Sequence, residues 1–169
     1  MGIYLNDMSV LGSLSSLSLW LAANALGAPA SPTLSCPHRT TSAGSQALDW
    51  RVEAGDSRAA FCLATRLQSL DGGELEGALV ALGQYGDQRP GELLLLARRG
   101  VLSRLSLADA VTMLPLSLTD DLPAQARAMK NRRDRFRRVA QPALFTERDL
   151  ALRSIDSALA EIRGHIRRH

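Results

Sequence analysis

Aromatic residues are scarce in this chain: they make up 4% of its 169 residues, so leucine and alanine must fill the core. The length is enough for one domain with a real core. Lysine is nearly absent, because Lys130 is the only one among 20 basic residues. This arginine bias is typical of a GC-rich bacterial genome. The net charge of +3 is too small to indicate a nucleic-acid partner by itself.

Motifs that carry chemistry are also lacking. The chain has three histidines, and none lies near an obvious serine or cysteine nucleophile motif. It contains no glycine-rich phosphate loop, dinucleotide-binding fingerprint or paired-cysteine zinc motif. Cys36 and His38 have no further ligands at metal-binding spacing. We therefore predict a protein that is not an enzyme and that needs no metal and no cofactor.

The N-terminal segment 8–30 carries no charge, is rich in leucine, serine and alanine, and ends in Ala28-Pro29-Ala30. This pattern predicts a signal peptide over residues 1–30, cleaved before Ser31. A signal peptide usually begins with Lys or Arg, and residues 1–7 contain neither. A buried first helix and a retained membrane anchor are the alternatives, although the serine-rich run is only moderately hydrophobic. We expect a periplasmic or secreted protein with no stable membrane span in the mature chain; a cytoplasmic location is the alternative.

The segment 31–46, rich in proline, serine and threonine, is expected to be an irregular linker or arm. It contains Cys36, and the only other cysteine is Cys62. In an exported protein, two cysteines favour one disulfide, which would tie the arm to the first core helix. The alternative is a pair of reduced thiols, with Cys62 as a small core residue.

Residues 47–169 show apolar residues at helical spacing, which predicts an all-α domain. Asp56 is placed to cap one helix, and Gly100 to end another. The last two helices, beginning near Asp121 and Thr146, are expected to pair as an antiparallel hairpin or to cap a solenoid. Their predicted apolar seams are Leu122, Ala126, Met129, Phe136 and Ala140, interrupted by Arg133, and Leu152, Ile155, Leu159, Ile162 and Ile166.

The stretch 78–97 reads as an apolar helix, a Gly-Asp turn and a second apolar helix. Leu79 and Leu82 share one helical face. We expect Gly83 to allow close backbone approach, Gly86 to stop the first helix in a left-handed conformation, and Asp87 to cap the second helix. Pro90 suits the first turn of that second helix.

This stretch resembles one unit of a HEAT-like α-solenoid repeat of the phycobilisome-lyase type. The positions that carry the resemblance are Ala78, Leu79, Leu82, Gly83, Gly86, Asp87 and Arg89. A step of 31 residues back aligns Gly86-Asp87 with Gly55-Asp56, and a step of about 32 forward reaches Ala110, so the resemblance covers residues 47–140. It implies a short solenoid of helical hairpins with a binding surface; the alternative is a compact helical bundle.

A basic cluster near the C-terminal end is the most distinctive local feature. Its members are Arg127, Lys130, Arg132, Arg133, Arg135, Arg137 and Arg138. One interpretation is a surface for an anionic partner such as nucleic acid, lipid headgroups or an acidic protein groove. The other is the solvated face of an amphipathic helix, with arginine stems covering apolar neighbours.

These observations lead to two functional hypotheses. The first is an exported, non-catalytic protein-interaction module, such as a periplasmic inhibitor or immunity-type protein, or an envelope adaptor. The alternative is a cytoplasmic adaptor or regulator that binds nucleic acid or another polyanion through residues 127–138.

Overall fold

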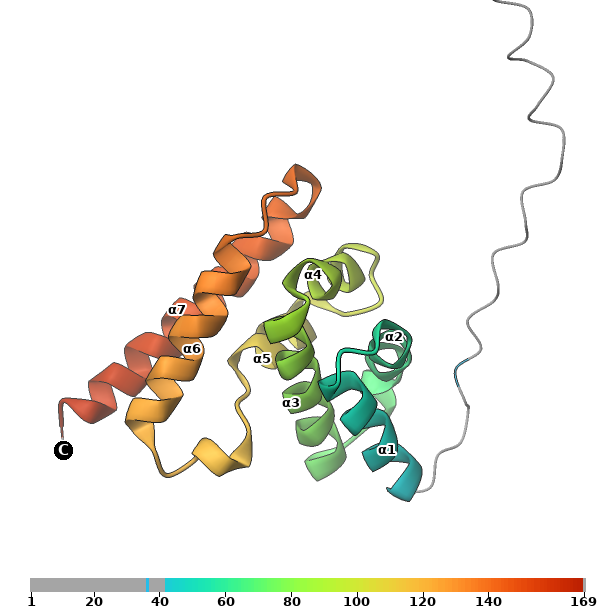
Figure 1. The fold of residues 1–169 in the computed structure, drawn as a ribbon, viewed down its shortest axis with the longest axis horizontal. Helices are drawn as coiled ribbons and strands as arrows, with labels where there is room; N and C mark the ends of the chain where they lie inside the picture. The colour runs from blue at the N-terminus through green and yellow to red at the C-terminus, as the bar shows by residue number, and fades with distance from the viewer. Residues whose placement is uncertain (1–35, 37–41, 169) are drawn as a thin grey trace, which may run out of the picture. The chain divides into compact units, whose positions relative to one another are not determined.

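Helices account for all the regular structure in the part of the chain that the computed structural model describes, Cys36 and residues 42–168 (Figure 1). The α-helices are α1 (Ser42–Glu53), α2 (Ser57–Arg66), α3 (Gly72–Gln88), α4 (Pro90–Arg98), α5 (Arg104–Thr112), α6 (Leu122–Arg137) and α7 (Phe145–Ile166). Short 3-10 helices span Leu67–Ser69, Leu116–Leu118 and Pro142–Leu144. The predicted all-α fold is confirmed.

Helix α1 begins inside the range 31–46 that was expected to be irregular. The expected signal peptide, residues 1–30, lies outside the described residues, as does the arm apart from Cys36 and the start of α1. Within the described part of the chain, we find no helix with the length and apolar character needed to cross a membrane.

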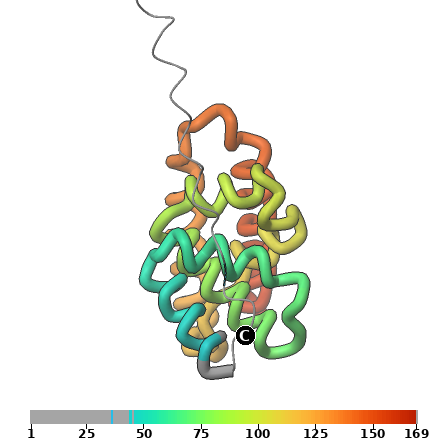
Figure 2. The backbone as a smooth tube through the Cα atoms, turned by 90° about the vertical axis from the view of Figure 1, so that its right-hand side faces the viewer, coloured from blue at the N-terminus to red at the C-terminus, as the bar shows by residue number. Residues whose placement is uncertain are grey.

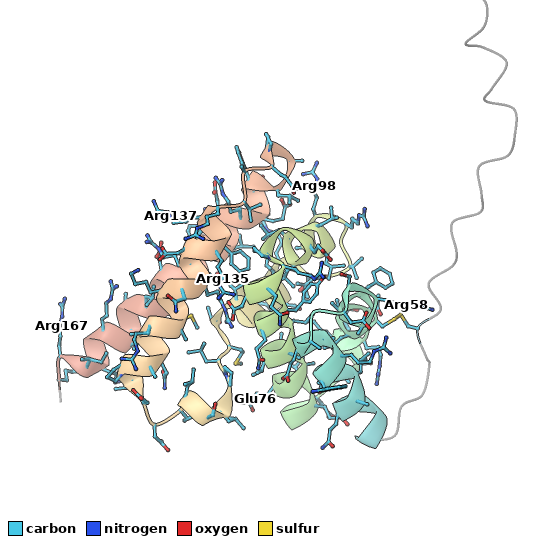
Figure 3. All side chains as sticks on the ribbon, viewed as in Figure 1. Arg58, Glu76, Arg98, Arg135, Arg137 and Arg167 are labelled. Atoms are coloured by element: carbon cyan, nitrogen blue, oxygen red, sulfur yellow. A yellow bond between two sulfur atoms is a disulfide. The ribbon has the colours of Figure 1, made fainter. Side chains whose placement is uncertain are left out.

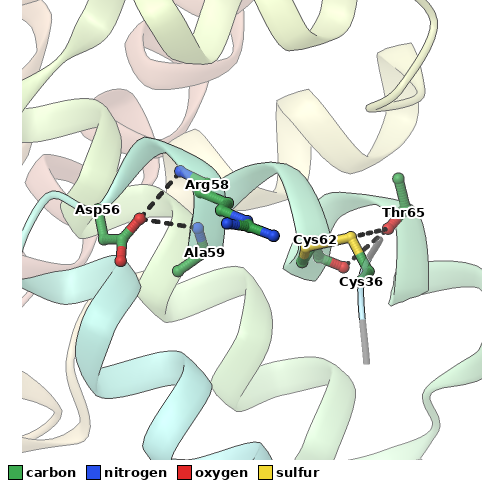
Figure 4. The surroundings of a disulfide bond; sticks show 6 residues. All are labelled: Cys36, Asp56, Arg58, Ala59, Cys62 and Thr65. Carbon is green, nitrogen blue, oxygen red and sulfur yellow. Dashed lines mark hydrogen bonds between the residues drawn. A yellow bond between two sulfur atoms is a disulfide. The ribbon is translucent and has the colours of Figure 1, made fainter. Parts of the chain in front are cut away.

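Local chemistry sets several helix ends. The Asp56 carboxylate accepts hydrogen bonds from the N–H groups of Arg58 and Ala59 at 2.9 and 3.0 Å, and so caps α2 as predicted (Figure 4). Gly100 ends α4 with a φ of 72°, also as predicted. Gly55 ends α1 in the same way, with a φ of 86°. Left-handed backbone at these positions favours glycine, and it turns the chain sharply into the next helix.

The helices are stacked so that α3 has a neighbour on each side. Figures 1 and 2 show α1 and α2 at one side, α3 and α4 next to them, and the α6–α7 hairpin at the other side, with α5 between α3 and α7. A continuous apolar core connects these layers. Among its fully buried side chains are Val52, Leu82, Leu93, Leu107, Val111, Phe136 and Ile155.

The antiparallel hairpin of α6 and α7 is present (Figure 1), but the buried face of α6 differs from the predicted one. Met129, Arg132 and Phe136 are buried, followed by Val139 just beyond the helix. The residue that interrupts the apolar seam is therefore Arg132, whereas Arg133 is partly exposed. On α7, Ile155 and Leu159 are buried as expected, whereas Ile166 is exposed.

The Gly-Asp pair of the repeat-like stretch has other roles than predicted. Gly86 lies inside α3 without a left-handed conformation, so it does not stop the helix. A Cβ there would meet Leu93 Cδ2 at 2.7 Å and Phe136 Cζ at 3.2 Å, so glycine at this position lets α4 and α6 pack close. Asp87 does not cap α4. The local conformations at Gly86-Asp87 and Gly55-Asp56 therefore differ.

The predictions for Gly83 and Pro90 agree with the structure. A Cβ on Gly83 would lie 2.4 Å from the carbonyl oxygen of Ala110, so α3 and α5 approach each other closely at this point. Pro90 occupies the first turn of α4. The N–H groups of a first turn have no partner within the helix, so the N–H that proline lacks costs no hydrogen bond.

Candidate functional site

The centre of the predicted basic cluster, Arg132, is buried rather than exposed. Its side chain is 1% exposed and forms a two-bond ion pair with Asp87 at the end of α3. Nε donates to Asp87 Oδ1 and Nη2 donates to Oδ2, each at 2.8 Å. This parallel geometry is the strongest form of an arginine–carboxylate interaction.

The same guanidinium also satisfies the end of α5. Nη1 donates to the carbonyl oxygens of Val111 at 3.0 Å and Met113 at 2.7 Å. The last carbonyls of a helix have no partner within the helix, so a cation at this position satisfies them and complements the helix dipole. Arg132 thus joins α3, α5 and α6, and the prediction that it binds an external partner is wrong.

Three other members of the basic cluster have partners within the chain. Arg133 forms an ion pair with Asp156 of α7 at 2.5 Å, and Lys130 forms one with Asp134 at 3.1 Å. Arg135 donates to the main-chain oxygen of Asp87, and Figure 3 shows its position on α6.

The remaining members, Arg127, Arg137 and Arg138, are exposed. Their side chains make no ion pair within the described part of the chain. Figure 3 shows Arg137 on the outer side of α6. The basic surface on α6 is therefore smaller than the sequence predicts.

Cys36 and Cys62 lie at disulfide distance, with 2.11 Å between their sulfur atoms and 5.4 Å between their Cα atoms (Figure 4). The bond attaches a residue that precedes α1 to the middle of α2. Cys62 is buried against the core. The predicted pairing is confirmed.

A groove runs along α3 from Gly73 to Gln84, and we call it the acidic groove. It has a volume of about 390 Å³. Asp49 and Glu53 of α1 form one side, and Pro115 and Leu116 of the α5–α6 connection form the other. Its floor on α3 consists of Gly73, Glu76, Gly77 and Val80, with Gln84 at one end.

The connection between α5 and α6 separates this groove from a second one. Figure 1 shows the connection passing between α3 and α6. The second groove, of about 420 Å³, is lined by this connection and by Met129 of α6 and Ile162 of α7. Leu116 and Glu76 line both grooves. Leu116 is 75% exposed and lies at the border of the two hollows.

The carboxylates of the acidic groove have no cationic partner within hydrogen-bonding range. None of the ion pairs among the described residues includes Asp49, Glu53 or Glu76. Burial raises the pKa of the Asp49 carboxyl, and the negative charge of Glu53 one turn away raises it further. The positive charge of Arg66 on α2 attracts Asp49 and offsets part of this rise. The lining of the groove itself includes three carboxylates and no basic side chain, so it is net negative.

A third hollow of about 360 Å³ lies between α1, α2 and α3, and it shares Asp49, Gly73 and Gly77 with the acidic groove. Leu63 and Leu70 give it an apolar side, and Glu74 adds a further carboxylate. Asp49 therefore faces two adjoining hollows.

One polar cluster links α2, α3 and α4. Glu92 accepts hydrogen bonds from the hydroxyl groups of Ser57 at 2.5 Å and Tyr85 at 2.6 Å, and it pairs with Arg89 at 2.8 Å. The hydrogen bonds from Ser57 and Tyr85 lower the pKa of Glu92. Burial, together with the hydrogen bond to Glu92, raises the pKa of Tyr85 to about 12. Both groups keep their ordinary charge at neutral pH, so this cluster has a structural role.

The grooves are not evident in the sequence because their residues come from separate segments. One local signal was present: Gly73, Gly77 and Val80 follow helical spacing on α3, so small residues share one face with Glu76. In the part of the chain that the structure covers, no three histidine, cysteine, aspartate or glutamate side chains gather as metal ligands. No protein-family model, curated protein or solved structure matches this chain.

Proposed function

We propose that this protein is an exported interaction module that binds another protein through the surface around Leu116. We define this Leu116 surface as the α5–α6 connection, residues 113–119, together with the acidic groove and the second groove beside it. The observation that carries the proposal is the exposed Leu116 side chain between two hollows of about 390 and 420 Å³.

An exposed leucine between grooves is suited to binding because its burial contributes roughly 2 kcal/mol. Interfaces concentrate their binding energy in a few buried residues, and the contacts around these residues exclude water. The Leu116 surface fits this pattern, since Met129, Val80 and Pro115 lie near the leucine and carboxylates surround it.

Export is supported by the Cys36–Cys62 pair, because disulfides persist in oxidising compartments and are rare in the bacterial cytosol. The proposal therefore places the protein in the periplasm or outside the cell. Within this class we propose an inhibitor, an immunity-type protein or an envelope adaptor. Each of these works by protein binding and needs no catalytic group.

Two leucines offer a matched test. Leu116 and Leu105 are 75% and 73% exposed, but Leu105 lines none of the three hollows. We expect Leu116→Asp to abolish the high-molecular-weight species that contains this protein in native extracts of its host, as measured by size-exclusion chromatography with immunodetection. Leu105→Asp should leave that species unchanged. The proposal is contradicted if circular dichroism shows that both variants are folded and both give the same elution profile.

The alternative function, polyanion binding by α6, depends on the residues that have no partner in the fold. These are Arg127, Arg137 and Arg138. Their replacement by glutamate should remove any salt-dependent binding to nucleic acid while the protein stays folded. Arg132 is unsuitable for such a test because its loss disrupts the packing of three helices.

A further inference from the structure

We infer that the acidic groove binds a basic amphipathic helix of a partner protein. This inference rests on the proposed function, and it identifies the chemistry of the partner at one part of the Leu116 surface. The shape of the groove, its charge and its apolar border all favour such a partner.

The shape suits a helix because the floor of the groove is itself a helix with small residues. A Cβ on Gly73 would meet no atom within 4 Å, and one on Gly77 would meet only Asp49 Oδ2 at 3.7 Å. The space above Gly73 is open, and at Gly77 the neighbour is the end of the Asp49 side chain, so another backbone can come close at Gly73. From residue 73 to residue 84 the floor extends roughly 16 Å, which is about three helical turns. An amphipathic helix lying in a groove is a common mode of peptide recognition.

The charge of the groove selects a cationic occupant. Asp49 and Glu53 occupy one side and Glu76 lies on the floor, while none of them has an ion-pair partner within the described residues. Burial raises the pKa of Asp49, the charge of Glu53 raises it further, and Arg66 of α2 lowers it in part. Lysine or arginine side chains from a partner would relieve this repulsion, whereas an acidic helix would increase it.

The apolar border of the groove indicates that the bound helix also has an apolar face. Val80 and the exposed Leu116 are the apolar side chains that an occupant would cover. The expected ligand is therefore a helix with an apolar stripe, flanked by lysine or arginine one turn apart.

A synthetic helical peptide tests this chemistry directly. The probe is an 18-residue amphipathic peptide of leucine and lysine, and its control replaces every lysine with glutamate. Isothermal titration calorimetry with the full disulfide-bonded protein should give a Kd of roughly 10 to 100 μM for the lysine peptide. The glutamate peptide should not bind.

Two variants locate the binding in the groove. Gly73→Leu fills open space on a helix, and Glu76→Arg reverses an exposed charge, which Figure 3 shows on α3. Each should weaken the lysine peptide about tenfold without loss of thermal stability. The matched controls are Gly164→Leu, which also points into open space, and Asp120→Arg, an exposed charge outside the groove. Both controls should bind the peptide as the unaltered protein does.

Three results would overturn the inference: no binding at about 1 mM peptide, equal affinity for both peptides, or equal affinity of the groove and control variants. Sedimentation of the protein alone provides a further test. A dimer that Gly73→Leu dissociates would mean that a second copy, rather than a separate basic partner, occupies the groove. If Leu116→Asp removes the native complex but the lysine peptide does not bind, only this inference fails and the proposed function stands.

Discussion

The Arg132 guanidinium and the Asp87 carboxylate, 45 residues apart in the sequence, form a two-bond ion pair with N–O distances of 2.8 Å. Arg132 is almost fully buried, whereas 29% of the Asp87 side chain is exposed. The pair therefore connects a buried cation to an anion that reaches solvent. Because Arg132 also binds the last carbonyls of α5, it sets the relative positions of three helices.

The first prediction concerns this pair. Asp87→Ala should destabilise the protein by about 3 kcal/mol, because it leaves the buried Arg132 charge without a counter-ion. The control is Asp134→Ala, which removes the exposed partner of Lys130 and should change stability little. Urea unfolding followed by circular dichroism gives both values. Equal stabilities of the two variants would show that Arg132 does not depend on Asp87.

The second prediction concerns two glycines, whose replacement by alanine should change the free energy of unfolding in opposite directions. Gly83→Ala should destabilise by about 2 kcal/mol, since its Cβ would overlap the main-chain oxygen of Ala110 and crowd Arg132. Gly164→Ala, in open space on α7, should stabilise by about 0.5 kcal/mol through helix propensity. Thermal unfolding of both variants provides the measurement. Stabilisation by Gly83→Ala would contradict the close approach of α3 and α5.

The parts of the fold that the sequence predicted are those set by local chemistry. Asp56 caps the helix that follows it, Gly100 ends the helix before it, and 3–4 spacing identifies α7. The roles of Arg132, Asp87 and Gly86 were predicted wrongly, because each depends on a helix far away in the sequence. The hydrophobic spacing did contain a signal: Met129, Arg132 and Phe136 follow the 3–4 rhythm, but a charge at the middle position conceals it.

The acidic groove was not predictable for a related reason. Its walls come from α1 and the α5–α6 connection, and its floor from α3, so no single segment shows it.

Export and the disulfide give a third prediction. Intact mass of the protein from its native host should correspond to a chain that begins at Ser31. Cys36 and Cys62 should resist alkylation until a reductant is added. Loss of the bond in a Cys36→Ala/Cys62→Ala variant should cost about 3 kcal/mol, since the disulfide closes a loop of 26 residues. A full-length chain with two free thiols would contradict export.

Asp49 and Asp56 should make the stability of the fold depend on pH in opposite directions. The pKa of Asp49 lies above its ordinary value of 3.8 because of burial and Glu53, so its ionised form opposes folding. That penalty is absent below pH 3.8 and appears as the pH rises through the folded-state pKa. Asp49→Asn should therefore stabilise by about 0.3 kcal/mol at pH 7 and give no gain in strong acid. It removes a partly buried charge and its repulsion from Glu53 one turn away, and it loses the attraction of Arg66.

Asp56 provides the comparison. Hydrogen bonds from the Ala59 N–H and from Arg51 lower its pKa below 3.8, so its charged form stabilises the fold. This stabilisation is complete above pH 3.8 and is lost as the pH falls through the folded-state pKa. Asp56→Ala should cost about 1 kcal/mol at pH 7 and less in acid. Denaturant titrations across this pH range measure both variants, and the same pH dependence for both would contradict the assigned environments.

The central claim is that the Leu116 surface contacts another protein in the cell. Photo-crosslinking tests it most directly, with a photoreactive amino acid placed at position 116 in one strain and at position 105 in another. We predict a discrete crosslinked species from position 116, larger than the protein alone, and none from position 105. Reduction of the 116 crosslink by Gly73→Leu would further place the partner in the acidic groove. No crosslink from position 116, or the same crosslinks from both positions, would contradict the claim.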